Sequence, residues 1–297
     1  MFGGPKNQKN RFVSHNYVIQ CLTKAKTELL PAQISPTLCD VLAIAQNTLL
    51  VSIARVNTKG VGATQCRPYI LTFNNGSKLF LKLTPAFNQS SNRQRQADKM
   101  ITNALGPEQS CPFILLTHSM IIEENDIKNE ILLFPFVPGD NLYITHQYLF
   151  PDEFNQRQHF FSLGVTLAKI HIGCMVNKKS YNSFLESYSL PPVLVHDDWQ
   201  STNIMITPDH KAVIIDTEGT HVSTNAYRNI IETWELVGKE HTLMQSFLSG
   251  YTHAFPTKDQ GNIFQSIIKV LIAHGIELPT SSSSSSLPET KLPQLKL

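Results

Sequence analysis

The chain lacks several features that would mark it as a specialised protein. No apolar run approaches the roughly 20 residues that cross a bilayer, so we expect no membrane span. A net charge of +2 over 297 residues is too small for the basic surface typical of nucleic-acid-binding proteins. Hydrophobic residues nevertheless make up 41% of the chain, which is enough for a substantial core. We therefore expect a globular protein that binds neither nucleic acid nor a membrane.

Cysteine is also sparse. The cysteines form no Cys-x-x-Cys pair and no Cys/His cluster, which argues against a zinc site or a disulfide framework. Free thiols of this kind are typical of a reducing compartment. Residues 1–11 are polar and lack the apolar stretch of a secretory signal. These features predict a cytoplasmic protein, with five scattered free thiols at Cys21, Cys39, Cys66, Cys111 and Cys174.

The first half of the chain reads as a helical extension followed by a small sheet. Apolar residues at helical spacing predict a helical extension over residues 1–50. The Asn74-Asn75-Gly76 turn, whose residues tolerate positive φ, predicts a β-hairpin. A helix is expected over residues 91–104. Together these elements predict an N-lobe over residues 51–138, with strands at 69–73, 78–83, 112–116 and 131–136.

The pattern of the second half is mostly helical. One apolar stripe predicts a long helix over residues 154–175, and helical spacing resumes over residues 227–276. Between them, two short apolar runs flank a polar segment over residues 193–215, which predicts a strand-loop-strand hairpin. We expect these elements to form a mostly helical C-lobe over residues 139–279.

The end of the chain has a different composition. Residues 280–297 contain six consecutive serines with prolines and lysines, and too little apolar surface to fold. We expect a disordered tail. Its Ser-rich composition with a glutamate and a leucine end also resembles the C-terminal translocation signals of some type IV secreted bacterial effectors. A secreted effector acting in a host cytosol is therefore an alternative to a cytoplasmic protein.

One segment has the residue spacing that phosphoryl transfer requires. Asp198 is followed by Asn203 five residues later, and by Asp216 after two apolar runs. One carboxylate can orient the proton of an attacking hydroxyl, while an amide oxygen and a second carboxylate can hold Mg²⁺ against phosphates. A hairpin formed by the two apolar runs would fix all three side chains on a rigid frame.

This segment resembles the signature of a known group of enzymes. The pattern His-x-Asp-x-x-x-x-Asn, an apolar strand and then Ile-Asp-x-Glu is similar to that of the aminoglycoside phosphotransferase and choline kinase group, a branch of the protein-kinase-like fold. The order of further segments agrees from about residue 50 to residue 251. The resemblance implies an α+β bilobal fold, with a small antiparallel β N-lobe and a mostly helical C-lobe. It also implies ATP and Mg²⁺ as cofactors.

The resemblance gives individual residues a role. Asp198 would face the acceptor hydroxyl, and Asn203 and Asp216 would bind Mg²⁺. Lys82 would contact the α- and β-phosphates, and His196 would hydrogen-bond backbone near the metal-binding turn. Two further sets of residues would bind ATP. The hinge at Phe134, Phe136 and Val137 would contact the adenine, and the loop with Gly60 and Gly62 would cover the phosphates.

Two departures from the family pattern concern carboxylates. Asp197 stands where glycine is common and adds a second carboxylate beside Asp198. In the family a glutamate of the following helix pairs with the lysine, but the helix expected over residues 91–104 contains none. Asp98 is its only acidic residue and is therefore the candidate partner of Lys82.

Two aromatic residues near the motif have competing interpretations. Trp199 lies inside the segment and is equally compatible with lining the acceptor site and with packing. His171 is expected to be a packed core histidine and not a catalyst.

We predict transfer of the γ-phosphoryl group of ATP to a hydroxyl of a small-molecule acceptor. One alternative is a protein Ser/Thr kinase of the same fold. Another is a pseudokinase that binds nucleotide without catalysis, because the helix glutamate is missing and the phosphate loop has few glycines. The presence of Asp198, Asn203 and Asp216 together favours an active enzyme.

Overall fold

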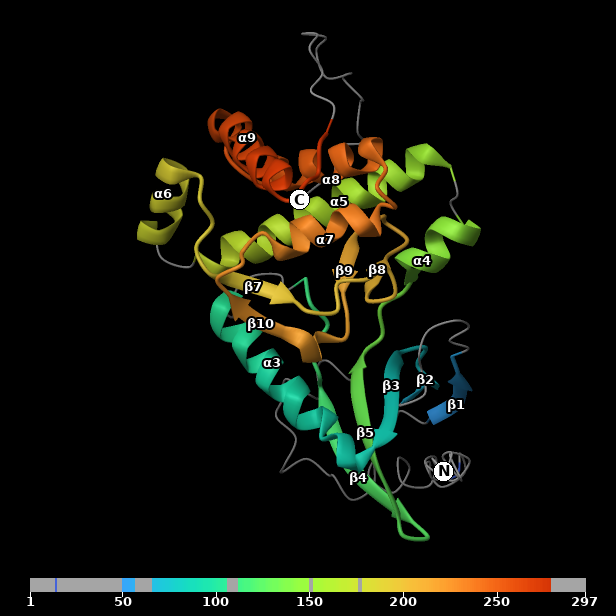
Figure 1. Ribbon diagram of the computed structural model, residues 1–297. Helices are drawn as coiled ribbons and strands as arrows, with labels where there is room; N and C mark the ends of the chain where they lie inside the picture. Colours follow the sequence, from blue (N-terminus) through green and yellow to red (C-terminus); the bar gives the residue numbers. More distant parts are fainter. Residues whose placement is uncertain are drawn as a thin grey trace, which may run out of the picture.

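The computed structural model describes residue 14 and residues 50–56, 66–105, 112–149, 152–175 and 178–278. Most of the expected N-terminal extension, Gly60 and Gly62 of the expected phosphate loop, and the Ser-rich tail lie outside these residues. Within them, a β-sheet with one long helix is followed by a largely helical part (Figure 1). The predicted α+β class, with a small antiparallel N-lobe and a mostly helical C-lobe, is confirmed.

The N-lobe is built on one antiparallel sheet of five strands in the order β1-β2-β3-β5-β4. Alternate side chains of β2 and β3 point to the same face, as the pleat of a strand requires, and form a compact apolar cluster around Leu71 and Leu81. The two strands turn at the predicted Asn74-Asn75-Gly76, where Gly76 has a φ of 82°. The strand bounds are β1 (Leu50–Arg55), β2 (Arg67–Phe73), β3 (Lys78–Pro85), β4 (His118–Glu124) and β5 (Ile127–Pro135).

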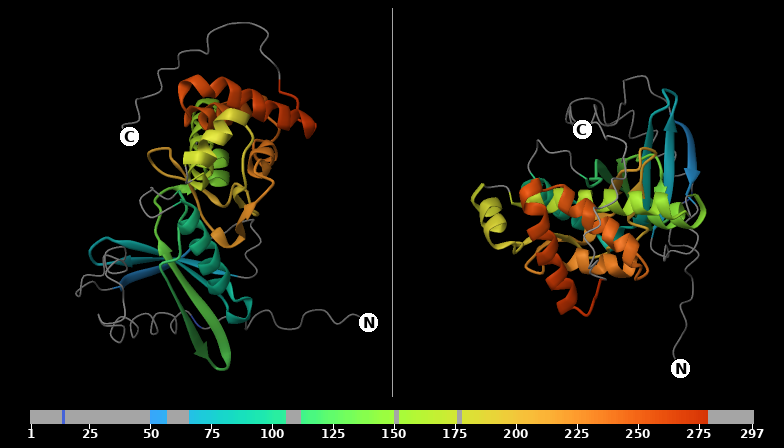
Figure 2. Two further views of the ribbon diagram at one scale, coloured as in Figure 1. Left: turned by 90° about the vertical axis from the view of Figure 1, so that its left-hand side faces the viewer. Right: turned by 90° about the horizontal axis from the view of Figure 1, so that it is seen from above.

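The expected strand over residues 112–116 is wrong. Phe113 forms an isolated bridge with Ile214, and the strand that precedes β5 is β4, which pairs with β5 in a projecting hairpin (Figure 2). The hairpin turns at Asn125 and Asp126, both with positive φ. Its turn contains no glycine and its outer positions are charged, so neither of the usual strand signals marks it in the sequence.

Helix α3 (Ser90–Leu105) follows the short η2 (Ala86–Asn88) and connects the two lobes (Figure 1). Ala97, Ile101 and Leu105 recur every four residues and therefore share one buried face of the helix. Ile101 and Leu105 belong to the main hydrophobic core of the C-lobe. The C-terminal half of α3 is thus fixed to the C-lobe, while its first turn faces the sheet.

The C-lobe combines helices with short strand pairs. The helical region expected over residues 227–276 is divided into three helices, α7, α8 and α9. The bounds are β6 (Asp140–Asn141), α4 (Leu142–Ile144), η3 (Thr145–Leu149), α5 (Glu153–Cys174), α6 (Lys178–Ser187), β7 (Val193–His196), β8 (Ile204–Ile206), β9 (Ala212–Ile214), η4 (Thr217–Gly219), β10 (Thr220–Ser223), α7 (Arg228–Leu236), α8 (His241–His253) and α9 (Thr257–Ala273).

Helices α5 and α8 pack closely together in the centre of the C-lobe. Gly164 of α5 and Gly250 of α8 lie at the crossing, where an added Cβ would overlap the backbone oxygens of Phe247 and Phe161. The absence of side chains at these two positions allows the helix backbones to approach.

The segment over residues 193–215 contains the expected hairpin, β8 with β9, and a further strand, β7, that belongs to a different sheet. Strand β8 pairs with β9, as expected from the two apolar runs, but β7 pairs with β10, which lies beyond Asp216. The loop between β7 and β8 turns the chain away from β7, so the partner of β7 comes from later in the sequence. These two pairs bring the residues of the predicted motif together.

Candidate active site

Three loop positions at the ends of the short strands carry the motif. Asp198 follows β7, Asn203 precedes β8, and Asp216 follows β9. Strands β7, β8 and β9 are largely buried, and Val195, Ile204 and Ile214 are residues of the core. The core therefore holds the ends of these loops in place while the polar side chains stay at its edge.

His196 connects the loop of Asp198 to the loop of Asp216. The residue is 1% exposed, and its Nδ1 atom accepts a hydrogen bond of 3.2 Å from the Asp198 backbone N–H. The proton of the neutral ring is then on Nε2, which donates to the backbone oxygens of Asp216 at 3.0 Å and Ile215 at 3.3 Å. This is the backbone contact that the resemblance implies for His196.

The Asp198 carboxylate is oriented by two amides. Its Oδ1 atom accepts a hydrogen bond from Gln200 Nε2 at 2.7 Å, and its Oδ2 atom accepts one from Asn203 Nδ2 at 2.7 Å. The Asn203 amide also donates to the Asp198 backbone oxygen at 3.0 Å. The Oδ1 atom of Asn203 makes no hydrogen bond to the part of the chain that the structure describes.

Asp197, the second carboxylate of the loop, is engaged elsewhere. It forms an ion pair with Arg228 and lies 3.3 Å from Nδ1 of His221. Its backbone N–H donates to the Gly219 oxygen at 3.1 Å. Asp197 thus fastens the loop to η4 and α7, and Asp198 is the carboxylate that faces the pocket described below.

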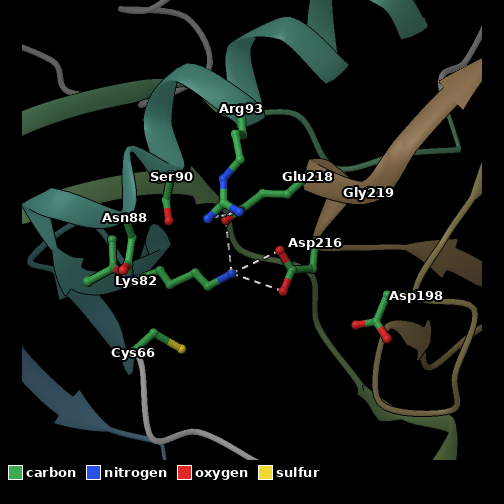
Figure 3. Close-up of a pocket in the computed structure, with 10 residues that line it drawn as sticks. Cys66, Lys82, Asn88, Ser90, Arg93, Asp198, Asp216, Glu218 and Gly219 are labelled. Carbon is green, nitrogen blue, oxygen red and sulfur yellow. Dashed lines mark hydrogen bonds and ion pairs between the residues drawn. The ribbon is translucent and has the colours of Figure 1, made fainter.

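Asp216 and Lys82 meet between the two lobes (Figure 3). Asp216 adopts a left-handed backbone conformation with a φ of 59°, which Asp tolerates better than most residues. Lys82 Nζ, from β3, lies 2.8 Å and 2.9 Å from the two carboxylate oxygens of Asp216, and 3.6 Å from Oε1 of Glu218. Burial alone would lower the pKa of Lys82, but the two carboxylates more than offset it and raise that pKa. The lysine is therefore a cation in this site.

The expected pairing of Asp98 with Lys82 is corrected by the structure. The Asp98 carboxylate accepts hydrogen bonds from the Leu116 backbone N–H at 2.7 Å, the Thr217 hydroxyl at 2.8 Å and Gln94 Nε2 at 2.9 Å. Among the described residues, the ion-pair partners of Lys82 are Asp216 and Glu218. Asp98 lies one and a half turns beyond Arg93 on α3 and reaches the turn after Asp216, not the lysine.

A pocket of about 220 Å³ brings residues of both lobes together (Figure 3). Five of the side chains that line it are charged, two of them cationic and three anionic. Its lining consists of Cys66, Lys82, Thr84, Asn88, Ser90, Arg93, Asp198, Asp216, Glu218 and Gly219. Of the predicted site residues, Lys82, Asp198 and Asp216 therefore share one pocket, and Asn203 donates a hydrogen bond to Asp198 without being part of the lining.

The predicted adenine-binding residues are not part of this lining. Phe134 is buried opposite Phe80 on the neighbouring strand, with 6.3 Å between ring centroids. The ring of Phe136 lies 5.4 Å from Lys78 Nζ. Both residues, with the half-buried Val137, lie at the end of β5, where the chain passes into the C-lobe (Figure 1).

The chemistry of the available donors fits Mg²⁺. Among the described residues, no three or more His, Cys, Asp or Glu side chains lie together so that they could hold a metal ion by themselves. Mg²⁺ in phosphoryl-transfer sites uses one or two carboxylates and completes its shell with phosphates and water. The Asp216 carboxylate and the Asn203 amide oxygen, which has no hydrogen bond within the described residues, are donors of the kind that would hold Mg²⁺.

The structure decides between the competing interpretations of Trp199 and His171. Trp199 is 8% exposed, and its indole N–H donates to the Thr233 hydroxyl at 3.0 Å, so it packs and does not line the pocket. His171 is fully buried and lies 2.7 Å from the Tyr251 hydroxyl, which confirms the expected core histidine.

Sequence reasoning gave no role to Arg93 and no definite role to Glu218. Arg93 Nη2 lies 3.2 Å from Oε2 of Glu218, and both line the pocket. Glu218 follows Asp216 by two residues, which was a usable signal. Arg93 stands among other polar residues of α3, and nothing in the sequence distinguishes it from Arg95.

Comparison with known proteins gives a likeness in structure only. A scan against known protein families found no match, and a search of curated proteins found no similar sequence. Among solved structures, the chain is similar to a macrolide 2'-phosphotransferase from Brachybacterium faecium, with 11% identity, a TM-score of 0.45, and coverage of 80% of this chain and 93% of that one.

Two further structures are similar at the same level. An aminoglycoside phosphotransferase from Alicyclobacillus acidocaldarius has 11% identity and a TM-score of 0.42, covering 72% of this chain and 78% of that one. A macrolide 2'-phosphotransferase type I has 16% identity and a TM-score of 0.42, covering 81% of this chain and 91% of that one. These are proteins that the chain resembles in outline, at low sequence identity.

Proposed function

We propose that this protein is an ATP- and Mg²⁺-dependent phosphotransferase that moves the γ-phosphoryl group of ATP to a hydroxyl of a small-molecule acceptor. The observation that carries the proposal is the meeting of Lys82, Asp198 and Asp216 in one pocket, with Asn203 bound to Asp198. Lys82 comes from the N-lobe sheet and the other three from the C-lobe. A site assembled from two lobes in this way can hold a nucleotide and an acceptor between them.

Each side chain has a role that its surroundings support. The Asp198 carboxylate, oriented by two amides and exposed, is suited to accept the proton of an acceptor hydroxyl. Lys82, a cation that lines the pocket, is suited to bind phosphate oxygens. Asp216 and Asn203 are the residues that would hold Mg²⁺. When bound, the ion would neutralise charge that develops on the phosphates.

The choice of a small-molecule acceptor depends on the resemblance of the motif to the aminoglycoside phosphotransferase and choline kinase group. The pocket itself supports phosphoryl transfer without specifying the acceptor. The alternative function, a protein Ser/Thr kinase, is therefore distinguished by the acceptor that is labelled in the test below.

The direct test is ATP turnover by the purified full chain, measured with radiolabelled ATP. The protein is assayed alone and then with aminoglycosides, macrolides, choline-like alcohols, inositol compounds and a cell lysate. Label appearing in a small molecule supports the proposal, whereas label appearing only in lysate proteins indicates a protein kinase.

A binding measurement separates an inactive nucleotide-binding protein from one that does not bind nucleotide. ATP with Mg²⁺ should raise the melting temperature of the parent protein, and Asp216→Ala should remove the Mg²⁺-dependent part of that rise. Stabilisation without turnover of any acceptor would indicate a pseudokinase. A parent protein that is not stabilised by ATP with or without Mg²⁺ would contradict the proposal.

A further inference from the structure

Helix α3 contributes no carboxylate to Lys82. Asp98 is the only acidic residue between Ser90 and Leu105, and its oxygens are used by Leu116, Thr217 and Gln94. A lysine whose flexible four-carbon stem has no fixed partner is poorly positioned for phosphate binding. The partner must therefore come from another element.

Asp216 alone is a poor permanent partner for the lysine. In the structure both of its carboxylate oxygens contact Lys82 Nζ. The same carboxylate is the proposed ligand of Mg²⁺, and an oxygen that binds the ion is no longer available to hold an ammonium group in the same geometry. A second carboxylate is needed to keep the lysine in place when the ion is present.

Glu218 meets this requirement. Its Oε1 atom lies 3.6 Å from Lys82 Nζ, and its Oε2 atom lies 3.2 Å from Arg93 Nη2, so one carboxylate bridges two cations (Figure 3). The side chain of Glu218 is 19% exposed and that of Lys82 is 16% exposed, so water screens their interaction only partly. Arg93, in the first turn of α3, connects the carboxylate to the helix.

We propose that Glu218 is the positioning residue of Lys82, and that Arg93 holds Glu218 in place from helix α3. The helix thus supplies a cation to the arrangement, and the turn after Asp216 supplies the carboxylate. This inference rests on the proposed function for the purpose of the lysine, which is to bind phosphate. The ion-pair arrangement itself can be tested without nucleotide.

The first test measures the lysine in the protein alone. Glu218→Gln should leave the Lys82 amine with Asp216 as its one remaining ion-pair partner and make it more reactive, because one of the two carboxylates that hold it is removed. Acylation of Lys82 by a small anhydride, quantified by mass spectrometry against Lys99 as internal reference, should become severalfold faster. Glu235→Gln, at an exposed residue paired with Lys239, serves as the matched control and should leave the rate unchanged. An unchanged rate in Glu218→Gln would overturn the proposal.

The second test separates lysine positioning from metal binding. Glu218→Gln should weaken binding of a non-hydrolysable ATP analogue about tenfold, by calorimetry, at both limiting and saturating Mg²⁺. In a Lys82→Met background, the same change should have no further effect, because there is no lysine left to position. A loss that higher Mg²⁺ restores, and that persists without the lysine, would show that Glu218 is a metal ligand and would overturn the proposal.

The contribution of Arg93 has its own matched control. Arg93→Gln should weaken binding of the analogue about threefold, while Arg95→Gln on the same helix, where the side chain bonds Ser119, should not. Equal effects of the two changes would remove Arg93 from the arrangement.

If the parent protein binds the analogue but transfers no phosphoryl group, the proposed function fails and these measurements still decide the positioning role. If the analogue does not bind, the acylation rates decide it alone.

Discussion

At the scale of single residues, the two adjacent carboxylates of the loop after β7 have different surroundings. Asp198 is held by neutral amides and lines the pocket, whereas Asp197 is paired with the Arg228 guanidinium and His221. A carboxylate held by neutral donors keeps its charge available to a substrate proton. Asp197 is not among the residues that line the pocket, so its carboxylate is not placed to meet an acceptor hydroxyl there.

Asp198→Asn is expected to reduce phosphoryl transfer by about 10²-fold or more while leaving nucleotide affinity nearly unchanged. The substitution keeps the size of the side chain and removes the charge that accepts the hydroxyl proton. Turnover and nucleotide binding of the purified variant check this. Asp197→Asn should cost much less turnover, and an Asp198→Asn variant within threefold of the parent would move the catalytic role to Asp197.

At the scale of elements, α3 fixes the turn that carries Asp216. Gln94 and Asp98 of the helix both contact the Thr217 hydroxyl, and Gln94 and Thr217 are completely buried. Asp98 also holds Leu116, in the segment that leads into β4. The carboxylate predicted to hold Lys82 thus has a structural role, which connects three separate segments behind the pocket.

Asp98→Ala is expected to lower the free energy of unfolding by about 1–3 kcal/mol, because it leaves the partly buried donors of Thr217 and Leu116 without an acceptor. Urea unfolding followed by circular dichroism measures the change. Thr217→Val should cost less in an Asp98→Ala background than in the parent, since the two side chains share one hydrogen bond. Strictly additive losses would show that the contact contributes nothing.

The close approach of α5 and α8 makes a second prediction at this scale. Gly164→Ala and Gly250→Ala are each expected to destabilise the protein by at least about 2 kcal/mol, because the new methyl group would overlap backbone of the facing helix. Gly261→Ala in α9 is the control, since no atom lies near its added Cβ, and it should be neutral or slightly stabilising. Melting temperatures of the three variants measure the difference, and equal behaviour of all three would contradict the packing.

At the scale of the whole molecule, buried histidines connect elements that are far apart in the sequence. His159 of α5 lies 3.3 Å from His146 of η3 and 3.0 Å from His210 of the β8–β9 turn, measured between ring nitrogens. His171 is fully buried beside Tyr251 of α8. Burial lowers the pKa of His159 to about 4 and that of His171 to about 3.

These lowered pKa values predict a loss of stability in acid. An unfolded histidine titrates near pH 6.5, so the unfolded chain takes up protons first as the pH falls. The stability that each neutral histidine contributes is complete above about pH 6.5 and is lost as the pH falls toward the folded-state pKa. Between pH 6 and pH 5, His171 alone should contribute a slope of about 1.2 kcal/mol per pH unit.

Urea unfolding of the parent and of His171→Gln at pH 7, 6 and 5 measures this slope. The variant is expected to be less stable at pH 7 and to lose stability less steeply toward pH 5. His253→Gln, at an exposed histidine near the end of α8, is the control and should follow the parent. Parallel pH profiles for the parent and His171→Gln would contradict the lowered pKa.

The sequence by itself determined much of the fold and the centre of the site. The alternation of apolar residues around Asn74-Asn75-Gly76 predicted β2 and β3, and helical spacing predicted α3 and α5, because local periodicity decides which face of an element is buried. The spacing of Asp198, Asn203 and Asp216 predicted that these residues act together, because two short strands between them limit how far they can separate.

Only the tertiary structure decided which charges pair. Asp98 accepts a hydrogen bond from Thr217 and does not pair with Lys82, and Asp197 pairs with Arg228. In the same way, the strand that pairs with β7 is β10. No local pattern specifies such contacts, because they join residues that are up to 119 positions apart and depend on how α3 and η4 pack. Asp98, the only carboxylate of the expected helix, was therefore the wrong partner for Lys82. Glu218, 136 positions after Lys82, is the residue that the fold brings to the lysine together with Asp216.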